Sequence, residues 1–139
     1  MKIILHEGDR YVLRFDRGEE ILGKLGRFCH LERIEAATFS AIGACGEATV
    51  CFYNLQTKKY EDTELKENLE IISLIGNVSV LDFKPLVHAH VTLGDSGLNV
   101  RGGHAKKLVV SATCEMSLQK FKGWIERKFD EETGLNLMN

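Results

Sequence analysis

The segment from Lys107 to Leu118 alternates between apolar and mostly polar side chains, and this pattern limits the fold more than any other. Successive side chains of a β-strand point to opposite faces, so an alternation with a period of two predicts a strand. A strand that is apolar on one face only is typical of an antiparallel sheet. The apolar face consists of Leu108, Val110, Ala112, Cys114, Met116 and Leu118.

Other segments also have strand character, and residues typical of turns or bends separate most of them. They are Tyr11 to Phe15, Ala37 to Ala44, Ala48 to Tyr53, Tyr60 to Leu65, Leu69 to Leu81, and Trp124 to Phe129. Gly43 and Gly46 favour a bend or bulge between the second and third of these segments, and Gly76 interrupts the fifth. Asp130 to Gly134 is predicted as a turn before a short tail.

One segment has the period of an amphipathic helix. Its apolar residues recur at helical spacing: Ile21, Leu22, Leu25, Phe28 and Cys29. Asp16 is predicted to cap this helix, with Glu19 at the third helical position. The sequence therefore predicts an α+β fold, in which a mostly antiparallel sheet packs with one principal helix.

The length of 139 residues and the hydrophobic content of 44% suit a single domain over residues 1–139. Two predicted strands, Ile71 to Val80 and Ala48 to Tyr53, are apolar on both faces. One helix cannot cover all of this surface, so further short helices or another subunit must do so. A small cyclic assembly of identical subunits is the economical solution, and the sequence leaves their number open.

Three of the five histidines lie close together in the sequence, at His88, His90 and, directly after Gly102-Gly103, His104. Residues two apart on a strand share a face, so His88 and His90 can point at one object. A hairpin turn at Asp95 to Gly97 would bring His104 back to them.

Three imidazoles that leave a position open are typical of a catalytic or exchangeable metal site. The alternative is that these histidines are ordinary surface or interface residues of a half-exposed strand. His6 and His30 are not expected to take part.

The four cysteines form no Cys-x-x-Cys pair and are predicted to be buried free thiols. They are Cys29, Cys45, Cys51 and Cys114.

The charge of the chain does not favour a nucleic-acid-binding surface. Lys and Arg number 18 against 20 Asp and Glu, which gives a net charge of −2 without a basic stripe. Basic residues near the C-terminal end, including Arg127, are diluted by acidic ones. The sequence has no membrane-spanning stretch and no apolar leader, and a cytoplasmic location is the expectation.

Several motifs follow one another from about residue 10 to about residue 117. They are Tyr11 to Glu20, Phe39 to Ala44, Leu69 to Asn77, His88 to Val91, and Gly102 to His104. In this order they resemble the plants-and-prokaryotes conserved domain, called the PPC domain, and the chain looks like a stand-alone prokaryotic member.

This resemblance implies an α+β fold that assembles as a homotrimer. It also implies that His88, His90 and His104 bind a divalent metal, with zinc as the first candidate. Bacterial and archaeal members of the family are often labelled as predicted DNA-binding proteins, by analogy with plant members that carry an AT-hook. This chain has no Arg-Gly-Arg-Pro hook and its single proline is Pro85, so weak or indirect DNA contact is the expectation.

Two classes of function follow from these observations. The first is a binding or regulatory module whose metal organises the site or senses a small-molecule ligand. The second is a metal-dependent enzyme of hydrolase or lyase type, in which the metal polarises a substrate or activates water. An enzyme of this kind needs a general base, and the acidic candidates are Glu47, Glu70 and Glu115. No phosphate-binding glycine loop, dinucleotide motif or nucleophilic serine motif is present. The binding or regulatory module is the favoured interpretation.

Overall fold

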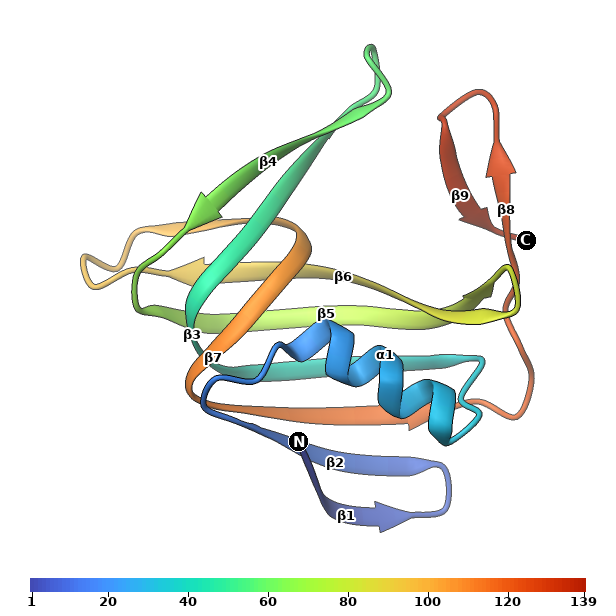
Figure 1. Ribbon diagram of the computed structural model, residues 1–139, viewed down its shortest axis with the longest axis horizontal. Coiled ribbons are helices and arrows are strands. Elements are labelled where there is room, and N and C mark those ends of the chain that lie inside the picture. Colours follow the sequence, from blue (N-terminus) through green and yellow to red (C-terminus); the bar gives the residue numbers. More distant parts are fainter.

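Seven antiparallel strands form one sheet, a helix packs against it, and a two-stranded hairpin lies at the C-terminal end (Figure 1). The computed structural model describes residues 1–139. The elements are β1 (Lys2–Glu7), β2 (Arg10–Asp16), α1 (Ile21–Leu31), β3 (Ala37–Asn54), β4 (Lys59–Leu65), β5 (Leu69–Leu81), β6 (Lys84–Gly94), β7 (Val100–Lys120), β8 (Arg127–Asp130) and β9 (Leu135–Met138). The predicted α+β fold, a mostly antiparallel sheet with one principal helix, is confirmed.

The order of the strands in the large sheet is β1-β2-β7-β6-β5-β3-β4, and β7 also pairs with β3. The pairings β7–β6, β6–β5, β5–β3 and β3–β7 therefore make a closed circuit. The long strands β3 and β7 allow this because each pairs with different neighbours along its length. Register shifts in β3 near Gly43, Cys45 and Thr49 mark bulges, which bend a strand and increase its twist.

The core lies between the sheet and α1, and the helix buries one face against it. The buried helical residues are Ile21, Leu25, Phe28 and Cys29, as the spacing predicts. The predicted cap is wrong. The helix begins at Ile21, and the Glu20 carboxylate accepts hydrogen bonds from the amides of Leu22 (3.1 Å) and Gly23 (2.6 Å).

The helix starts later than predicted because the chain before it is already bound to β7. The amide of Gly18 donates to the carbonyl of Val110 (2.8 Å), and the amide of Val110 donates to the carbonyl of Glu19 (3.0 Å). Gly18 has a φ of 82°, a left-handed conformation that glycine adopts without strain. These bonds hold residues 16–20 out of the helix.

Several strand boundaries differ from the predicted ones. The strand β3 runs without a break through Gly43, and β5 runs without a break through Gly76. The strand β7 begins well before Lys107, and β8 begins at Arg127 rather than at Trp124. The strands β1 and β9 were not predicted. All residues of β1 are exposed, so it has no alternating pattern from which a strand could be recognised.

The helix is neither long nor apolar enough to cross a membrane.

Candidate metal centre

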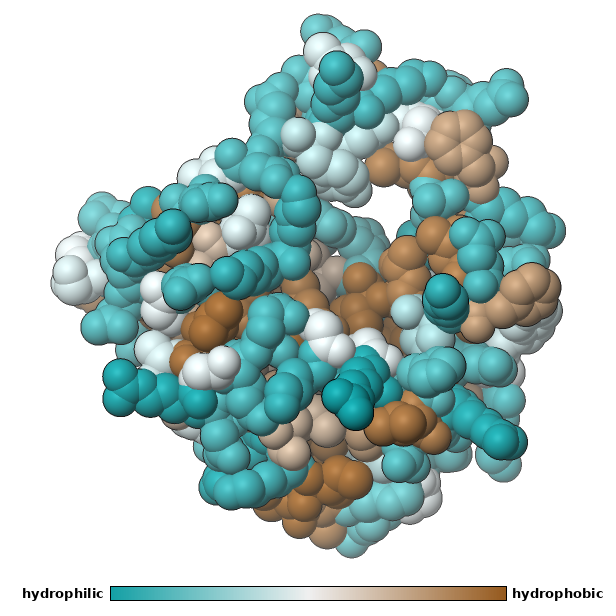
Figure 2. All heavy atoms as spheres, viewed as in Figure 1, coloured by the Kyte–Doolittle hydropathy of each residue, from teal (hydrophilic) through white to brown (hydrophobic).

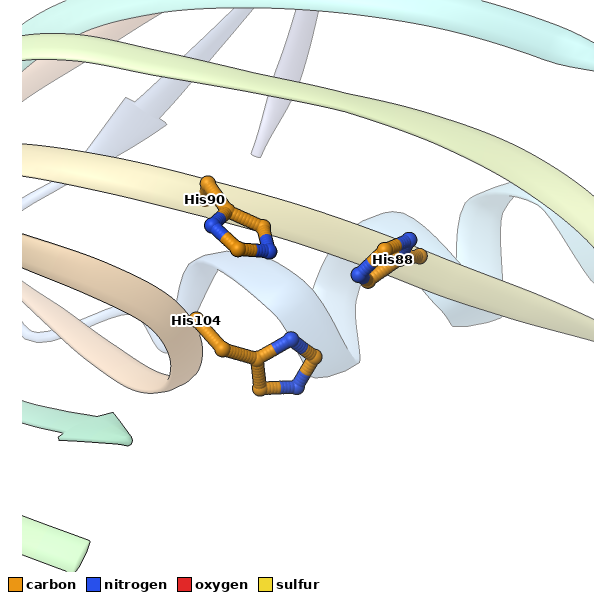
Figure 3. A group of neighbouring side chains, drawn as sticks. All are labelled: His88, His90 and His104. Atoms are coloured by element: carbon orange, nitrogen blue, oxygen red, sulfur yellow. The ribbon is translucent and has the colours of Figure 1, made fainter. Parts of the chain in front are cut away.

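His88, His90 and His104 come together on the face of the sheet that points away from α1 (Figure 3). His88 and His90 lie two apart on β6, and the register places His104 of β7 directly opposite His90. One ring nitrogen from each residue lies within 4.8 Å of the others. The ring centroids are 5.2 Å to 5.6 Å apart. The structure thus brings together the three histidines that the sequence singles out.

Gly102 and Gly103 make this arrangement possible because they let β7 lie close to the backbones of β6 and β3. A Cβ atom on Gly102 would lie 2.3 Å from the carbonyl oxygen of Val91, and one on Gly103 would lie 2.8 Å from that of Cys51. The strand β7 therefore passes between β6 and β3 with no room for side chains just before His104. Two glycines in a row can allow an unusual backbone, but neither of these has a positive φ, so what matters here is that they lack a side chain.

The residues of the cluster fit a metal ion. Burial and the neighbouring positive charges lower the pKa of His88 to about 4, and burial also lowers the pKa of His104. Both rings are therefore neutral at physiological pH and keep a lone pair that a metal can accept. Three nitrogen donors are fewer than a closed tetrahedral site has, so a metal bound here would keep a position for water or a ligand.

Two further side chains border the cluster, and sequence reasoning identified neither. The ring of Tyr60 on β4 lies 5.0 Å from the ring of His104, measured between centroids. Nη2 of Arg127 on β8 lies 3.5 Å from Nδ1 of His88. Both come from hairpins that are distant in sequence from the histidines, so no local pattern could have indicated them.

The other two histidines lie elsewhere, as predicted. His6 stacks on Tyr11 with ring centroids 4.0 Å apart, and its Nε2 lies 2.8 Å from the carbonyl oxygen of Gly8. His30 is exposed in the last turn of α1. Neither of them belongs to the histidine group.

The acidic candidates for a general base do not join the histidine group either. Glu47 accepts a hydrogen bond from Lys107 (2.9 Å). Glu70 and Glu115 are exposed on β5 and β7.

The four cysteines are free and buried, as predicted, and burial raises the pKa of each thiol. They therefore stay protonated and are poor metal ligands.

Comparison with known proteins places the chain among solved structures of the same fold. A metal-containing protein from Archaeoglobus fulgidus is 41% identical, covers 100% of this chain and 99% of its own, and has a TM-score of 0.90. A plant- and prokaryote-conserved protein from Pyrococcus horikoshii is 39% identical, covers 100% and 97%, and has a TM-score of 0.90. A proposed DNA-binding protein from Bacteroides thetaiotaomicron is 30% identical, covers 97% and 94%, and has a TM-score of 0.94.

None of the curated proteins matches this sequence. The sequence profile of the Plants and Prokaryotes Conserved (PCC) domain matches residues 5–122, which include β2 to β7 and all three histidines of the cluster. The resemblance seen in the sequence motifs is thus supported over most of the chain. The chain belongs to the plants and prokaryotes conserved domain family.

Proposed function

We propose that this protein is a binding module that holds one divalent metal ion, with zinc as the first candidate, at His88, His90 and His104. The observation that supports this function is the convergence of three ring nitrogens within 4.8 Å on the outer face of the sheet. A solved structure 41% identical to this chain is described as a metal-containing protein. A structural zinc site usually has four protein ligands, and this cluster supplies three. The remaining position can hold an exchangeable ligand.

Metal analysis of protein reconstituted with Zn²⁺ and freed of excess metal tests this function. We expect one ion per chain in the wild type and none in His90→Ala, because two imidazoles rarely hold a labile ion against buffer. His30→Ala is the matched control and should keep the full stoichiometry. One tightly bound ion in a triple alanine variant of the cluster, or no ion in the wild type, would contradict the assignment.

The same proposal includes a homotrimer, in which copies of the chain cover the sheet face away from α1. Large apolar side chains are exposed on this face, among them Ile42 (60% exposed), Ile72 (49%) and Ile75 (61%). Ile75 pairs directly with His90, so the apolar face and the histidine cluster are continuous. Exposed apolar surface of this kind is typical of an interface between subunits.

Direct DNA binding is expected to be weak, salt-sensitive and indifferent to sequence. With a net charge of −2, the chain has little excess positive charge with which to neutralise phosphates and release counterions from a duplex. The lysines beside the cluster are paired with carboxylates, Lys106 with Asp62 and Lys107 with Glu47. Submicromolar and sequence-selective binding at physiological salt would overturn this part of the proposal.

The second candidate function is a metal-dependent enzyme of hydrolase or lyase type, and the observation that favours it is the open position of a three-histidine site. No carboxylate joins the histidine group to act as a general base. We therefore place the binding module first. Turnover of esters or 2-oxo acids that requires the metal and disappears in His90→Ala would reverse this order.

A further inference from the structure

We propose that the ligand of this centre is a small carboxylate, held between the open position of the metal and the guanidinium of Arg127. This inference rests on the proposed metal site and deepens it by naming the chemical class of the ligand.

The first observation is that the charge of Arg127 has no counterion. This half-buried side chain donates hydrogen bonds from Nε to Oγ of Ser79 (2.7 Å), from Nη1 to the carbonyl of Asn136 (2.8 Å) and from Nη2 to Oδ1 of Asn77 (3.0 Å). All three acceptors are neutral, and Arg127 takes part in no salt bridge. A partly desolvated cation without an anion is costly, so an anion would stabilise it.

Three cations of β7 near the cluster are paired with carboxylates. Arg101 on β7 donates to Glu67 at 2.7 Å, and Lys106 and Lys107 pair with Asp62 and Glu47. Arg127 differs from these three cations because no carboxylate pairs with it. The carboxylate it lacks can be supplied by a ligand.

The second observation is the position of the guanidinium beside the metal ligands. Nη2 lies 3.5 Å from Nδ1 of His88, which is too long for a strong hydrogen bond. An arginine has five N–H donors. Three of them bind neutral acceptors, a fourth makes only this long contact with His88, and the fifth has no partner, so a ligand can bind the fourth and the fifth. The anchors on Ser79 and Asn77 hold the guanidinium in place, so its free donors are already positioned beside the cluster.

The third observation limits the size of the ligand. The hydroxyl of Tyr53 donates to the carbonyl of Thr133 (2.7 Å), and Nζ of Lys58 donates to that of Glu131 (2.5 Å). These bonds join the β3–β4 hairpin to the β8–β9 hairpin, and the surface has an opening below the joined hairpins (Figure 2). Tyr60 reaches the cluster from one of these hairpins and Arg127 from the other. Because the two joined hairpins lie beside the histidines, they favour a small ligand over a macromolecule.

Charge and shape together indicate a carboxylate. No acidic side chain belongs to the histidine group, so the positive charge of a divalent ion held there and of Arg127 beside it has no compensating carboxylate within the group. A guanidinium can donate hydrogen bonds to both coplanar oxygens of a carboxylate, and a metal ion can coordinate one of the same oxygens. A phosphate site usually combines several cationic or backbone donors, whereas the cation that contacts the histidine group here is Arg127.

The test uses the full chain loaded with Co²⁺, whose visible spectrum reports on its ligands. Acetate should change the spectrum of the wild type in a saturable way, whereas acetamide, which has the same shape and no charge, should not. In Arg127→Met the metal content should be unchanged and the acetate affinity should fall by about tenfold. Arg127→Lys should lie between the two, because it keeps the charge and loses the planar fork. Arg101→Met is the matched control and should bind acetate like the wild type.

The outcomes separate this inference from the proposed metal site. Failure of the wild type to hold Co²⁺ would overturn both. A wild type that holds Co²⁺ and binds acetate no better than acetamide, or binds inorganic phosphate more tightly than acetate, would overturn the carboxylate alone. These two comparisons need only the wild type, so they decide the question even if Arg127→Met does not fold.

Discussion

At the scale of single residues, the site depends on glycines that bring backbones together. The strand β7 fits between β6 and β3 because Gly102 and Gly103 have no side chains to meet the carbonyl oxygens of Val91 and Cys51. Gly76 has the same role in β5, where a Cβ atom would lie 2.3 Å from the carbonyl oxygen of His88. The positions of all three histidines therefore depend on the close contact of four strands, β3, β5, β6 and β7.

Gly102→Ala should lower the free energy of unfolding by roughly 1–3 kcal/mol, because the added methyl group forces β7 away from β6. It should also weaken metal binding, since His104 follows two residues later. Chemical denaturation and metal titration measure the two effects. Gly123→Ala is the matched control, because nothing lies within 4 Å of the atom it adds, and it should change stability by less than about 0.5 kcal/mol. Equal stability of the two variants would contradict this account.

The buried cysteines make stability depend on pH in the alkaline range. Burial raises the pKa of Cys29 and Cys114 to about 12 and that of Cys45 to about 11, from an ordinary value of 9.0. As the pH rises above 9.0, the unfolded chain loses its thiol protons before the folded chain does. The stabilisation is therefore complete below pH 9.0 and is lost as the pH rises through the raised values.

We expect the free energy of unfolding to fall steadily between about pH 9 and pH 11, as measured by urea denaturation at each pH.

At neutral pH all four thiols should react slowly with a thiol reagent in the native protein and rapidly in denaturant. A thiol that reacts rapidly in the native state would show that its burial is incomplete.

At the scale of elements, the start of α1 illustrates how tertiary contact selects a cap. Glu20 has a longer side chain than the usual capping residues, and it folds back over the first turn to reach the amides of Leu22 and Gly23. Gly23 leaves room for it, because a Cβ atom there would lie 2.7 Å from Oε2 of Glu20. The same carboxylate accepts a bond from the amide of Leu108 (3.3 Å), which ties the helix to β7.

Glu20→Ala should therefore lower the free energy of unfolding by about 1 kcal/mol, since the first helical amides lose their acceptor. Glu20→Gln keeps a carbonyl oxygen at the same place and should cost less. Thermal or urea denaturation of both variants provides the measurement. If the alanine and glutamine variants were equally stable, the side-chain oxygen would have no capping role.

At the scale of the whole molecule, the single chain leaves the apolar sheet face away from α1 uncovered. Ile42, Ile72 and Ile75 are exposed there, and a hollow of about 550 Å³ lined in part by Val12 and Ser117 lies beside Ile75. The helix lies on the opposite side of the sheet and cannot reach this surface. Association of identical chains would bury it.

Light scattering at micromolar concentration should give about three times the chain mass of 15.6 kDa. Ile75→Lys should shift the protein towards the monomer, because it places a charge in the proposed interface. Phe83→Lys is the matched control: Phe83 is 93% exposed in the turn between β5 and β6, and its replacement should leave the mass unchanged. A wild-type mass near 15.6 kDa would contradict the trimer.

The sequence by itself determined the features that depend on local pattern. Alternation predicted the long strands, helical spacing predicted the buried face of α1, and the spacing of His88 and His90 placed two rings on one face. The sequence also showed Gly102 to His104 as a family-like motif, but the reason for its glycines, the nearness of other backbones, became visible only in the structure. These features follow from residues that are near one another in the chain.

Only the tertiary structure decided the features that depend on contacts between distant segments. The closed circuit of β3, β5, β6 and β7, the late start of α1 and the exposed strand β1 have no local pattern that distinguishes them. The same is true of Arg127 and Tyr60, which reach the cluster because two hairpins meet above it. The sequence shows Arg127 only as one basic residue among acidic neighbours, because the nearness of residues 88 and 127 arises when the chain folds.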